Sequence, residues 1–374
     1  MNRQELRLAL RMIPFLNELD GDAHGVLQLR EKRWLVWHPD VVASLWRNDR
    51  TLGHPKSRTL SPLLGNGSML WMDGPEHAEY RRFIGPALRG RNLVRYEEII
   101  HELVGRTIEE LRPGDRVGLA EWTRKLTLRV VGRIVLGVDD DVLLQAFSKW
   151  LDRRLGNRAR TLAHRFLGRG VPRFDDEVDR MLLDRARNAE PPALAALLPP
   201  TNLRDQLVSL LFAGHETTAG ATAWTFYWLD RNPELCEEIQ AGDEELLTAT
   251  IMESLRLCPP ATLAGNRSTP TGLVLTPSIY LAHRRKESFP DPKSFDPHRF
   301  LGKRPPSSHF FPFGGGVRHC LGMDLALLEI RLIVTALLRR RQVRCLRPRS
   351  CAPQLRGAAM APPPGLAMVT TCRP

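Results

Sequence analysis

The stretch that decides the fold is Phe313-Gly314-Gly315-Gly316-Val317-Arg318-His319-Cys320-Leu321-Gly322, which leads into an apolar segment of helical spacing at 321–341. Three consecutive glycines can take positive φ angles and let the backbone approach another group closely. The stretch therefore predicts a tight loop that presents one sulfur, that of Cys320, at the N-terminus of a helix. Backbone N–H groups and the positive end of the helix dipole favour thiolate over thiol there.

A lone thiolate limits the kind of metal site that this loop can serve. The six cysteines form no CxxC pair, and they are Cys236, Cys258, Cys320, Cys345, Cys351 and Cys372. Six in a chain of this length are too few for a disulfide scaffold, so we expect a reducing compartment. Zinc and iron–sulfur sites need several protein ligands, whereas haem iron needs one axial ligand. A lone cysteine is more often an inert buried residue, but the three glycines that precede Cys320 favour its role as a haem ligand.

The same loop resembles a known family signature. Phe313, Gly316, Arg318, Cys320 and Gly322 fill the pattern Phe-x-x-Gly-x-Arg-x-Cys-x-Gly, which is similar to the haem-binding signature of cytochromes P450. The resemblance implies haem b (iron protoporphyrin IX) with Cys320 as the metal ligand, Phe313 near the sulfur and Arg318 at a haem propionate. Gly314 belongs to the same cofactor loop.

A second motif, AGHETT at 213–218, lies in the middle of an apolar helix predicted over 203–230. Ala213 and Thr217 are four residues apart and share one face. The threonine hydroxyl competes for the carbonyl of residue 213, which predicts a local groove. An ordinary buried helix with back-bonded polar residues explains this hexapeptide equally well. The motif resembles the family's oxygen-binding groove, which implies proton delivery by Glu216 and Thr217 and cofactor contacts from Ala213 and Gly214.

Two further sets of charged residues follow the order of the family's motifs. Glu253 and Arg256 lie three apart on one helical face, which is a weak signal alone. The resemblance implies that they form a structural cluster with Arg299 behind the haem. His77 and Arg81 match a propionate-binding pair at the start of a helix, although a solvated helix start is the simpler interpretation of that segment alone. Arg267 fits a later propionate-binding arginine. The residues expected at the substrate are Ser209, Phe212, Ala213, Thr262, Leu263 and Met360.

The remaining patterns predict a mostly α fold with minor β, in one cytochrome P450 domain over 1–374. The small β-rich part is expected mainly near 24–40 and 270–282, and the helical haem-binding core at about 73–258 and 310–345. Apolar spacings of three and four predict helices at 76–110, 122–136, 143–155, 174–188, 203–230, 234–258 and 321–341. The chain is shorter than is usual for the family, chiefly between about 156 and 205, which predicts a trimmed or open pocket lid.

The excess of basic residues raises the question of which partners the protein binds. The net charge of +12 comes from 54 Lys and Arg against 42 Asp and Glu, but no nucleic-acid-binding motif accompanies it. No stretch of about 18 apolar residues predicts a membrane span. We therefore expect no nucleic acid and no membrane, a cytoplasmic location and a monomer. A nucleic-acid-binding protein with an accidental cysteine loop is the least favoured alternative.

No nicotinamide or flavin module is recognisable, because the glycine run precedes a cysteine and does not open a strand–helix phosphate loop. Electrons from NAD(P)H are therefore expected through separate proteins, an acidic ferredoxin or flavodoxin and its reductase. The face behind Cys320 would attract such a partner. The residues expected on that face are Arg82, Arg318, Arg331 and the cluster Arg339–Arg341.

The resemblance implies a haem-thiolate monooxygenase that uses dioxygen to hydroxylate or otherwise oxidise a small organic substrate, in natural-product (secondary) metabolism. Oxidative coupling or cyclisation on the same fold is an alternative. A haem-binding sensor or carrier without turnover is another. Glu216 and Thr217 argue against the carrier, since a carrier has no use for proton delivery.

Overall fold

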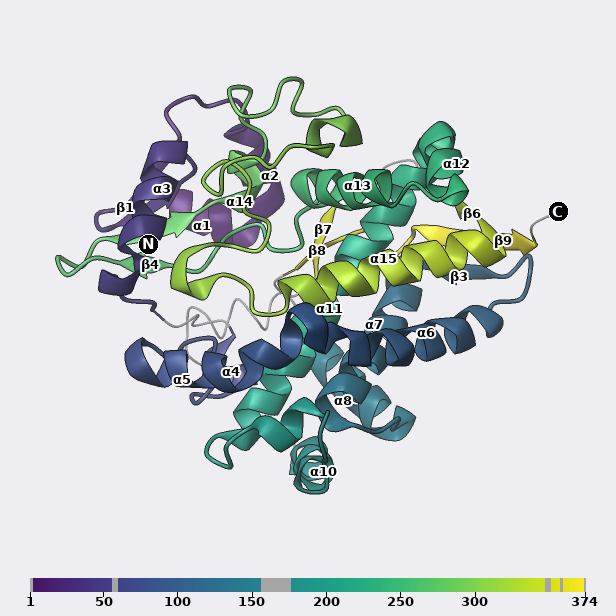
Figure 1. Cartoon of the computed structure of the whole chain (residues 1–374). Helices are drawn as coiled ribbons and strands as arrows, with labels where there is room; N and C mark the ends of the chain where they lie inside the picture. Colours follow the sequence, from purple (N-terminus) through teal and green to yellow (C-terminus); the bar gives the residue numbers. More distant parts are fainter. Residues whose placement is uncertain (1–2, 56–59, 156–175, 347–350, 357–358, 373–374) are drawn as a thin grey trace.

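Most of the chain is helical, and the helices stack around one long central helix (Figure 1). The computed structural model describes residues 3–55, 60–155, 176–346, 351–356 and 359–372. The helices are α1 (Arg3–Leu10), α2 (Met12–Glu18), α3 (Pro39–Asn48), α4 (Ser61–Leu64), α5 (Gly74–Ile84), α6 (Val94–Glu109), α7 (Leu119–Leu136), α8 (Asp141–Leu155), α10 (Asp176–Arg187), α11 (Leu203–Arg231), α12 (Pro233–Ala241), α13 (Glu244–Leu257), α14 (Ile279–Ala282) and α15 (Met323–Arg340).

The strands form small sheets, and the two larger ones lie toward opposite ends of the molecule (Figure 1). They are β1 (Val26–Arg30), β2 (Arg33–Val36), β3 (Arg116–Gly118), β4 (Arg267–Ser268), β5 (Val274–Pro277), β6 (Arg341–Leu346), β7 (Gln354–Arg356), β8 (Ala359–Ala361) and β9 (Ala367–Cys372). One sheet has the order β1-β2-β5-β4, in which only β2 and β5 are parallel. A second has the order β3-β9-β6, and β7 pairs with β8.

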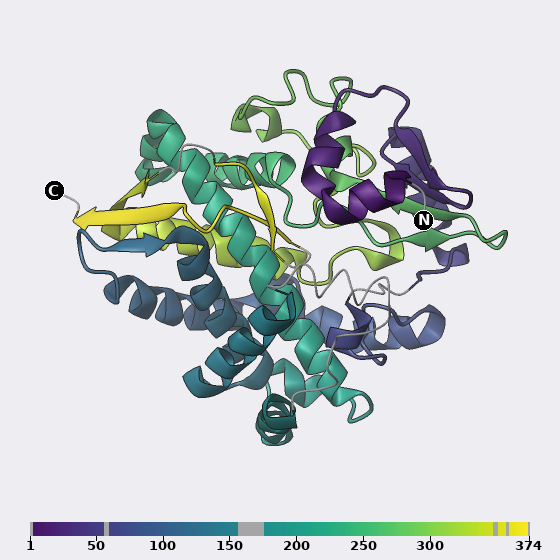
Figure 2. The ribbon, with the colours of Figure 1, turned by 180° about the vertical axis from the view of Figure 1, so that it is seen from behind.

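The central helix α11 crosses the whole helical region, as the view from behind shows (Figure 2). Its 29 residues span about 43 Å. It packs most extensively against α7 and also contacts α15 and α13. Most of its side chains are buried, as expected for a largely apolar helix inside the fold. The core of the molecule is therefore built around α11.

The predicted class, mostly α with minor β, is confirmed, but two predicted helices are each two helices. The segment 76–110 is α5 and α6 with 3₁₀ turns at 85–88 and 90–93, where Pro86 and Gly90 (φ +55°) interrupt the helical backbone. The segment 234–258 divides at Gly242 (φ +110°), and Asp243 then caps α13 by accepting a hydrogen bond from the Leu246 N–H at 2.8 Å.

The other predicted helices are confirmed with small shifts at their ends. Residues 156–175, which include much of the segment expected to form the lid, lie outside the described residues. The predicted hairpin near 24–40 is β1 and β2, and the region 270–282 contributes β5. Strands β3, β4 and β6 to β9 lie outside the expected β-rich segments, because strands of two to six residues leave little periodicity to detect.

The chain between α14 and the Cys320 loop meanders, and a fully buried arginine holds it. Arg256 forms a bidentate ion pair with Glu253, with Nε and Nη2 at 2.7 and 2.8 Å from the carboxylate oxygens. Its remaining hydrogen bonds go to backbone carbonyls of the meander, at His283 (2.9 Å), Pro292 (2.7 Å) and Ser294 (3.0 Å). All five N–H groups of the guanidinium are thereby used.

Arg299 completes this cluster, since its Nε lies 3.2 Å from Glu253 Oε1. The same carboxylate oxygen accepts from the Asp296 N–H at 2.9 Å. The structure thus brings together Glu253, Arg256 and Arg299, the three residues predicted to cluster. A buried carboxylate and a buried guanidinium tie α13 to the meander at several points.

We predict that Arg256→Gln lowers the free energy of unfolding by about 3–5 kcal/mol, because Glu253 is left buried without its counter-charge. Urea unfolding of the purified protein measures this loss. Asp184 and Arg187 form the matched control, since they have the same spacing but are about two-thirds exposed. Arg187→Gln should change stability by less than about 0.5 kcal/mol. A loss below about 1 kcal/mol for Arg256→Gln would contradict the structural role.

Candidate active site around Cys320

The loop before Cys320 is shaped by glycines that nothing larger can replace. Gly314 and Gly316 have φ angles of +69° and +65°. A Cβ on Gly316 would lie 2.0 Å from a carboxylate oxygen of Asp49, and one on Gly315 would lie 2.5 Å from the indole of Trp46. The Cys320 N–H closes the loop by donating to the Phe313 carbonyl at 2.9 Å. The predicted tight loop is therefore present, and it packs closely on the end of α3.

Cys320 itself is exposed to solvent, yet protein surrounds it closely. Burial raises the pKa of its thiol, although the N–H of Gly322 and the charge of Arg81 act in the opposite direction. The thiolate at Cys320 stays a prediction, which the backbone N–H and Arg81 favour and burial opposes. A bound cation would have to supply the missing stabilisation.

The exposed face of α11 is the second component of the site. Ala213 and Thr217 are exposed, whereas Phe212, His215 and Glu216 around them are buried. The Thr217 hydroxyl donates to the Ala213 carbonyl at 2.7 Å, which is the predicted back-bond. Among residues 203–230 of α11 only Ala213 and Thr217 are exposed, and because they lie four apart they leave one face of the helix uncovered near its middle.

Gly214 lies next to this face but points elsewhere. A Cβ at Gly214 would come within 2.6 Å of Cγ2 of Val131 in α7. The glycine therefore allows α11 and α7 to approach closely. Its contact with the cofactor stays a prediction.

Glu216 also points toward α7. Its Oε1 accepts hydrogen bonds from Nε and Nη2 of Arg124, at 3.0 and 2.7 Å, and His215 Nε2 lies 3.4 Å away. Burial raises the pKa of Glu216, but His215 and Arg124 outweigh it and lower the pKa to about 2. Arg124 also contacts Asp152 at 3.2 Å, and Asp152 accepts from Arg356 at 2.8 Å. An ion-pair chain therefore leads from Glu216 to the surface.

The four residues expected at the propionates lie around the Cys320 loop. Arg81 donates to the His319 carbonyl at 2.8 Å. His77 is buried, and burial together with Arg318 and Arg81 lowers its pKa to about 4, so it is neutral at pH 7. Arg267 is buried in an ion pair with Asp49, with Nε 2.5 Å from Oδ1. These side chains gather positive charge at one edge of the site.

Arg318 occupies the same edge. Its side chain is 11% exposed and lies 3.3 Å from Asp73, and both Nη atoms donate to carbonyls, those of Met69 and Met72. Its Nε is buried and has no hydrogen-bond partner. Arg318 therefore lies inside the molecule, and its predicted place on an electron-partner docking face is wrong, because its guanidinium is turned inward onto these carbonyls.

The residues expected at the substrate are mostly engaged with protein. The Ser209 hydroxyl is 2.6 Å from that of Ser68 and donates to the Asp205 carbonyl at 2.5 Å. The Thr262 hydroxyl is 3.2 Å from the sulfur of Met12, and Met360 is fully buried in β8. Phe212 and Leu263 are at least partly buried. Ala213 has the most open position of the set.

Three residues of this region were missed by sequence reasoning. Asp49 and His54 lie at the edge that holds Arg267 and Arg318, and Arg124 holds Glu216. None of them stands in a motif. Their partners are 5 to 218 residues away in the chain, so no local spacing could have identified them.

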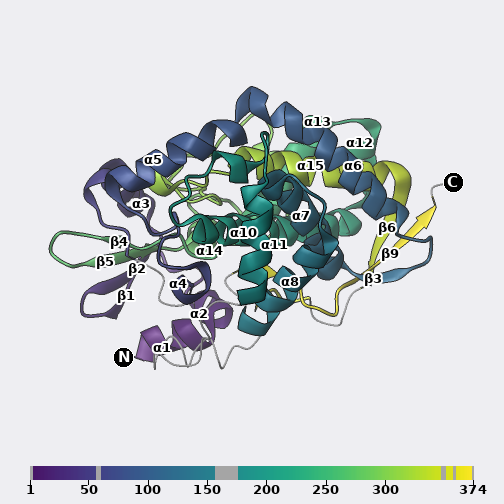
Figure 3. The same cartoon turned by 90° about the horizontal axis from the view of Figure 1, so that it is seen from below.

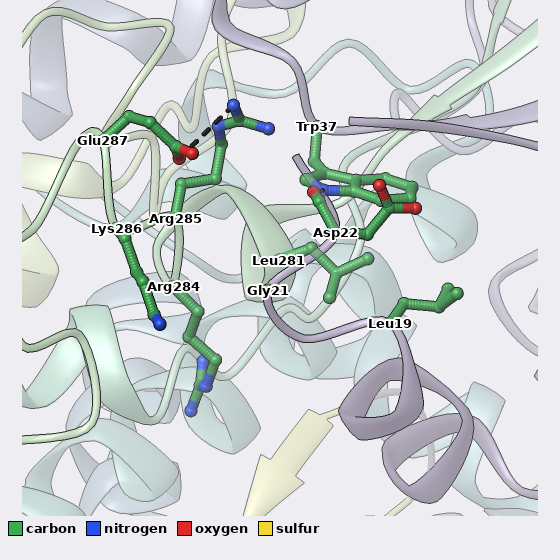
Figure 4. Close-up of a pocket in the computed structure, with 9 residues that line it drawn as sticks. All are labelled: Leu19, Gly21, Asp22, Trp37, Leu281, Arg284, Arg285, Lys286 and Glu287. Carbon is green, nitrogen blue, oxygen red and sulfur yellow. Dashed lines mark hydrogen bonds and ion pairs between the residues drawn. The ribbon is translucent and has the colours of Figure 1, made fainter. Parts of the chain in front are cut away.

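A separate hollow lies between α2, β2 and the segment after α14 (Figure 4). Two contacts lie among its lining residues: Arg285 lies 3.4 Å from Glu287, and the Trp37 indole N–H donates to the Asp22 carbonyl at 3.3 Å. None of the residues at Cys320 or on the open face of α11 lines it.

The residues around Cys320 fit a haem. One uncovered sulfur offers a single soft ligand, which suits a haem iron. Arginine side chains gather at one edge, and the buried Nε of Arg318 lacks the acceptor that a propionate oxygen would supply. The open face of α11 leaves space where a planar group and a small molecule could lie.

Comparisons with known proteins agree with this geometry. The sequence model of the cytochrome P450 family matches residues 143–369. Putative cytochrome P450 138 of Mycobacterium tuberculosis is 30% identical over 325 residues, which cover 75% of this chain and 73% of the relative. Putative cytochrome P450 135B1 of the same organism is also 30% identical, over 87% of this chain and 79% of its own length.

Solved structures give the same result for the fold. A 6-coordinated cytochrome P450 from Thermus thermophilus superposes with a TM-score of 0.79 at 28% identity, over 97% of this chain and 98% of that chain. CYP175A1, from another strain of the same organism, superposes with a TM-score of 0.77 at 29% identity, over 98% of each chain. The chain therefore belongs to the cytochrome P450 family, and it is a haem-thiolate monooxygenase.

Proposed function

We propose that Cys320 and the open face of α11 border one space, in which a haem and a small organic substrate lie face to face. The observation that carries this proposal is the exposure of Ala213 and Thr217 in the middle of a helix whose other residues from 203 to 230 are buried or half-buried. The side chains expected near this space are largely apolar, which suits an organic substrate with few charges. We further propose that all of residues 1–374 serve this one P450 unit.

The bound haem supplies the redox-active iron at which dioxygen is reduced. Cys320 would hold the iron through its sulfur, and the Gly314–Gly316 backbone would keep that sulfur in place. Arg81, Arg267 and Arg318 would bind the propionates. Glycine at 316 is essential to this arrangement, since Asp49 leaves no space for a side chain.

Thr217 and Glu216 would take part in proton transfer. Because the Thr217 hydroxyl already donates to the Ala213 carbonyl, its lone pairs remain free to accept a hydrogen bond from a group in the open space. Glu216 is ionised and points toward Arg124, so it must leave Arg124 to exchange a proton with that space. Arg124, Asp152 and Arg356 would then connect Glu216 to solvent. These roles favour turnover over a haem carrier.

The decisive test of the proposed ligand is the ferrous–CO difference spectrum of the purified holoprotein. We predict a strongly red-shifted Soret band, which requires thiolate ligation, and its loss in Cys320→Ala. Cys258→Ala serves as the control, because Cys258 is buried elsewhere and burial raises the pKa of its thiol to about 12. A red-shifted band that persists in Cys320→Ala would disprove the assignment.

We predict that Thr217→Ala retains haem and substrate binding but diverts electrons to hydrogen peroxide and water, with roughly a tenfold or greater fall in product per NAD(P)H consumed. The matched control is Thr222→Ala, since the Thr222 hydroxyl makes the same back-bond, to the Thr218 carbonyl at 2.8 Å, but is fully buried. Product yield and peroxide are measured together. Equal coupling in Thr217→Ala and the unaltered protein would rule out the proton role.

We also propose that electrons arrive from a separate acidic protein that docks beside Cys320. Helix α5 and the turns after it contact the Cys320 loop through Arg81 and Gly85, and they lie alongside α15 and α6 (Figure 3). This segment carries exposed arginines at 82, 89, 91 and 95 and an exposed Phe83. The Arg339–Arg341 cluster lies at the other end of α15, about 26 Å along the helix axis.

We predict that Arg89→Glu slows reduction by an acidic ferredoxin roughly fivefold or more at low ionic strength, because it reverses a charge beside the Cys320 loop. Arg339→Glu makes the same charge change at the far end of α15 and should slow reduction less than about twofold. Stopped-flow reduction at two salt concentrations measures both effects. A larger effect of Arg339→Glu would move the docking face to that end.

Among the helices of the described residues, none combines the length and the apolar character that a membrane span requires. The natural-product substrate, the choice between hydroxylation and coupling, and the cytoplasmic location stay predictions from the sequence. Screening purified holoprotein for substrate-induced spin shifts would identify the substrate class directly.

A further inference from the structure

Five ionisable side chains from separate parts of the chain form a continuous series of contacts along one edge of the site. They run from Arg267 in β4 through Asp49, His54 and Asp73 to Arg318 in the Cys320 loop. The successive distances are 2.5 Å (Arg267 Nε to Asp49 Oδ1), 3.1 Å (Asp49 Oδ1 to His54 Nε2), 2.7 Å (His54 Nδ1 to Asp73 Oδ1) and 3.3 Å (Asp73 Oδ1 to Arg318 Nη2). Arg267 and Arg318, the two ends, are the arginines assigned to the propionates.

His54 occupies the middle of this chain and contacts a carboxylate with each ring nitrogen. An ionised carboxylate only accepts hydrogen bonds, so both contacts are satisfied only when both nitrogens carry a proton. The backbone N–H of His54 adds a further bond to Asp73 Oδ2 at 2.9 Å. Its side chain is 6% exposed. The geometry of these two contacts therefore suits an imidazolium at this position.

Asp49 connects the imidazolium to the Cys320 loop. Besides Arg267 and His54, it accepts from the Val317 N–H at 2.7 Å, and its carboxylate fills the space that a Cβ on Gly316 would need. Burial raises the pKa of Asp49, but the bonds from His54 and Arg267 outweigh it and lower that pKa to about 2. Asp49 is thus an ionised carboxylate, 1% exposed, that touches the loop, an arginine and the imidazolium.

We propose that Asp49 and His54 are positioning residues for haem binding, with the charged imidazolium of His54 holding together the two carboxylates that orient Arg267 and Arg318. This inference rests on the proposed function, because it assumes that those arginines face the propionates. Neither Asp49 nor His54 touches the metal ligand. Their effect reaches the haem through the arginines and through Val317.

The groups around His54 determine how this series of contacts from Arg267 to Arg318 responds to pH. Asp49 faces His54 from the end of α3, and Asp73 faces it from the start of α5. The positive charges of Arg267 and Arg318 lie behind these two carboxylates, together with His77, which is neutral. A neutral imidazole could donate to only one of the two carboxylates. Burial raises the pKa values of Asp49 and Asp73, but hydrogen bonds from His54 and nearby arginine charges outweigh it and lower both, that of Asp49 to about 2, so both carboxylates stay ionised at neutral pH.

The test is the rate of haem transfer from the ferric holoenzyme to excess apomyoglobin, measured between about pH 5.5 and 9, a range that spans the titration of histidine. We expect His54→Gln to transfer haem roughly tenfold faster or more at about pH 6, because a neutral amide cannot donate to both carboxylates. The unaltered protein should approach the variant as the pH rises, and the variant should show no such dependence. The reduction potential of the haem, measured by spectroelectrochemistry, should shift in the same variant.

A second variant distinguishes the loss of a charge from damage to the fold. Asp73 caps α5 and is about half exposed, and asparagine caps a helix as well as aspartate does, so Asp73→Asn removes the charge while keeping the cap. It should also accelerate transfer, and its effect should not add to that of His54→Gln. His24→Gln is the control, since His24 pairs with Asp22 at 3.0 Å on the surface and is 89% exposed.

The outcomes distinguish this inference from the proposed function. If the unaltered protein lacks the red-shifted ferrous–CO band, the proposed function fails. If the band is present but both variants transfer haem within about twofold of the unaltered rate, only the positioning role is overturned. If the variants transfer haem faster but show the same dependence on pH as the unaltered protein, the positioning role is also overturned. A structural role alone predicts that result.

Discussion

The whole arrangement depends on keeping one face of α11 uncovered in the middle of a closely packed core. Protein interiors leave few voids larger than a water molecule, so an open face next to Ala213 and Thr217 requires a frame that cannot collapse. Gly214 provides part of that frame, because it lets α11 sit directly against Val131 of α7. The helix is held firmly from one side, so its other side can remain open for a cofactor and a substrate.

Buried ion pairs supply much of the remaining frame, and they act by joining distant segments. Glu253 and Arg256 bind the meander, Asp49 and Arg267 bind the Cys320 loop to β4, and Glu216 and Arg124 join α11 to α7. Apolar side chains of similar volume could stabilise the fold equally well. Charged groups differ in that each contact has a defined direction and a required partner, so they fix how loops lie as well as how tightly they pack.

The predictive power of the sequence ends where contacts become non-local. The Cys320 loop and the AGHETT segment could be identified because the chemistry of each lies within a short run of consecutive residues. The splits at Gly242 and at Pro86 were also readable in principle from helix-stop residues, but apolar periodicity continued across them. Asp49, His54 and Arg124 gave no signal, since a lone charged residue is usually solvated, and only the folded chain brings them to their partners.

Opposing electrostatic effects meet at the sulfur of Cys320. Burial raises the pKa of the thiol, whereas the N–H of Gly322 and the charge of Arg81 lower it. A metal bound there would favour the thiolate, because a coordinating thiol gives up its proton. The surrounding chain supplies direction, since Asp49 accepts a hydrogen bond from the Val317 N–H and fills the space that a side chain at 316 would need.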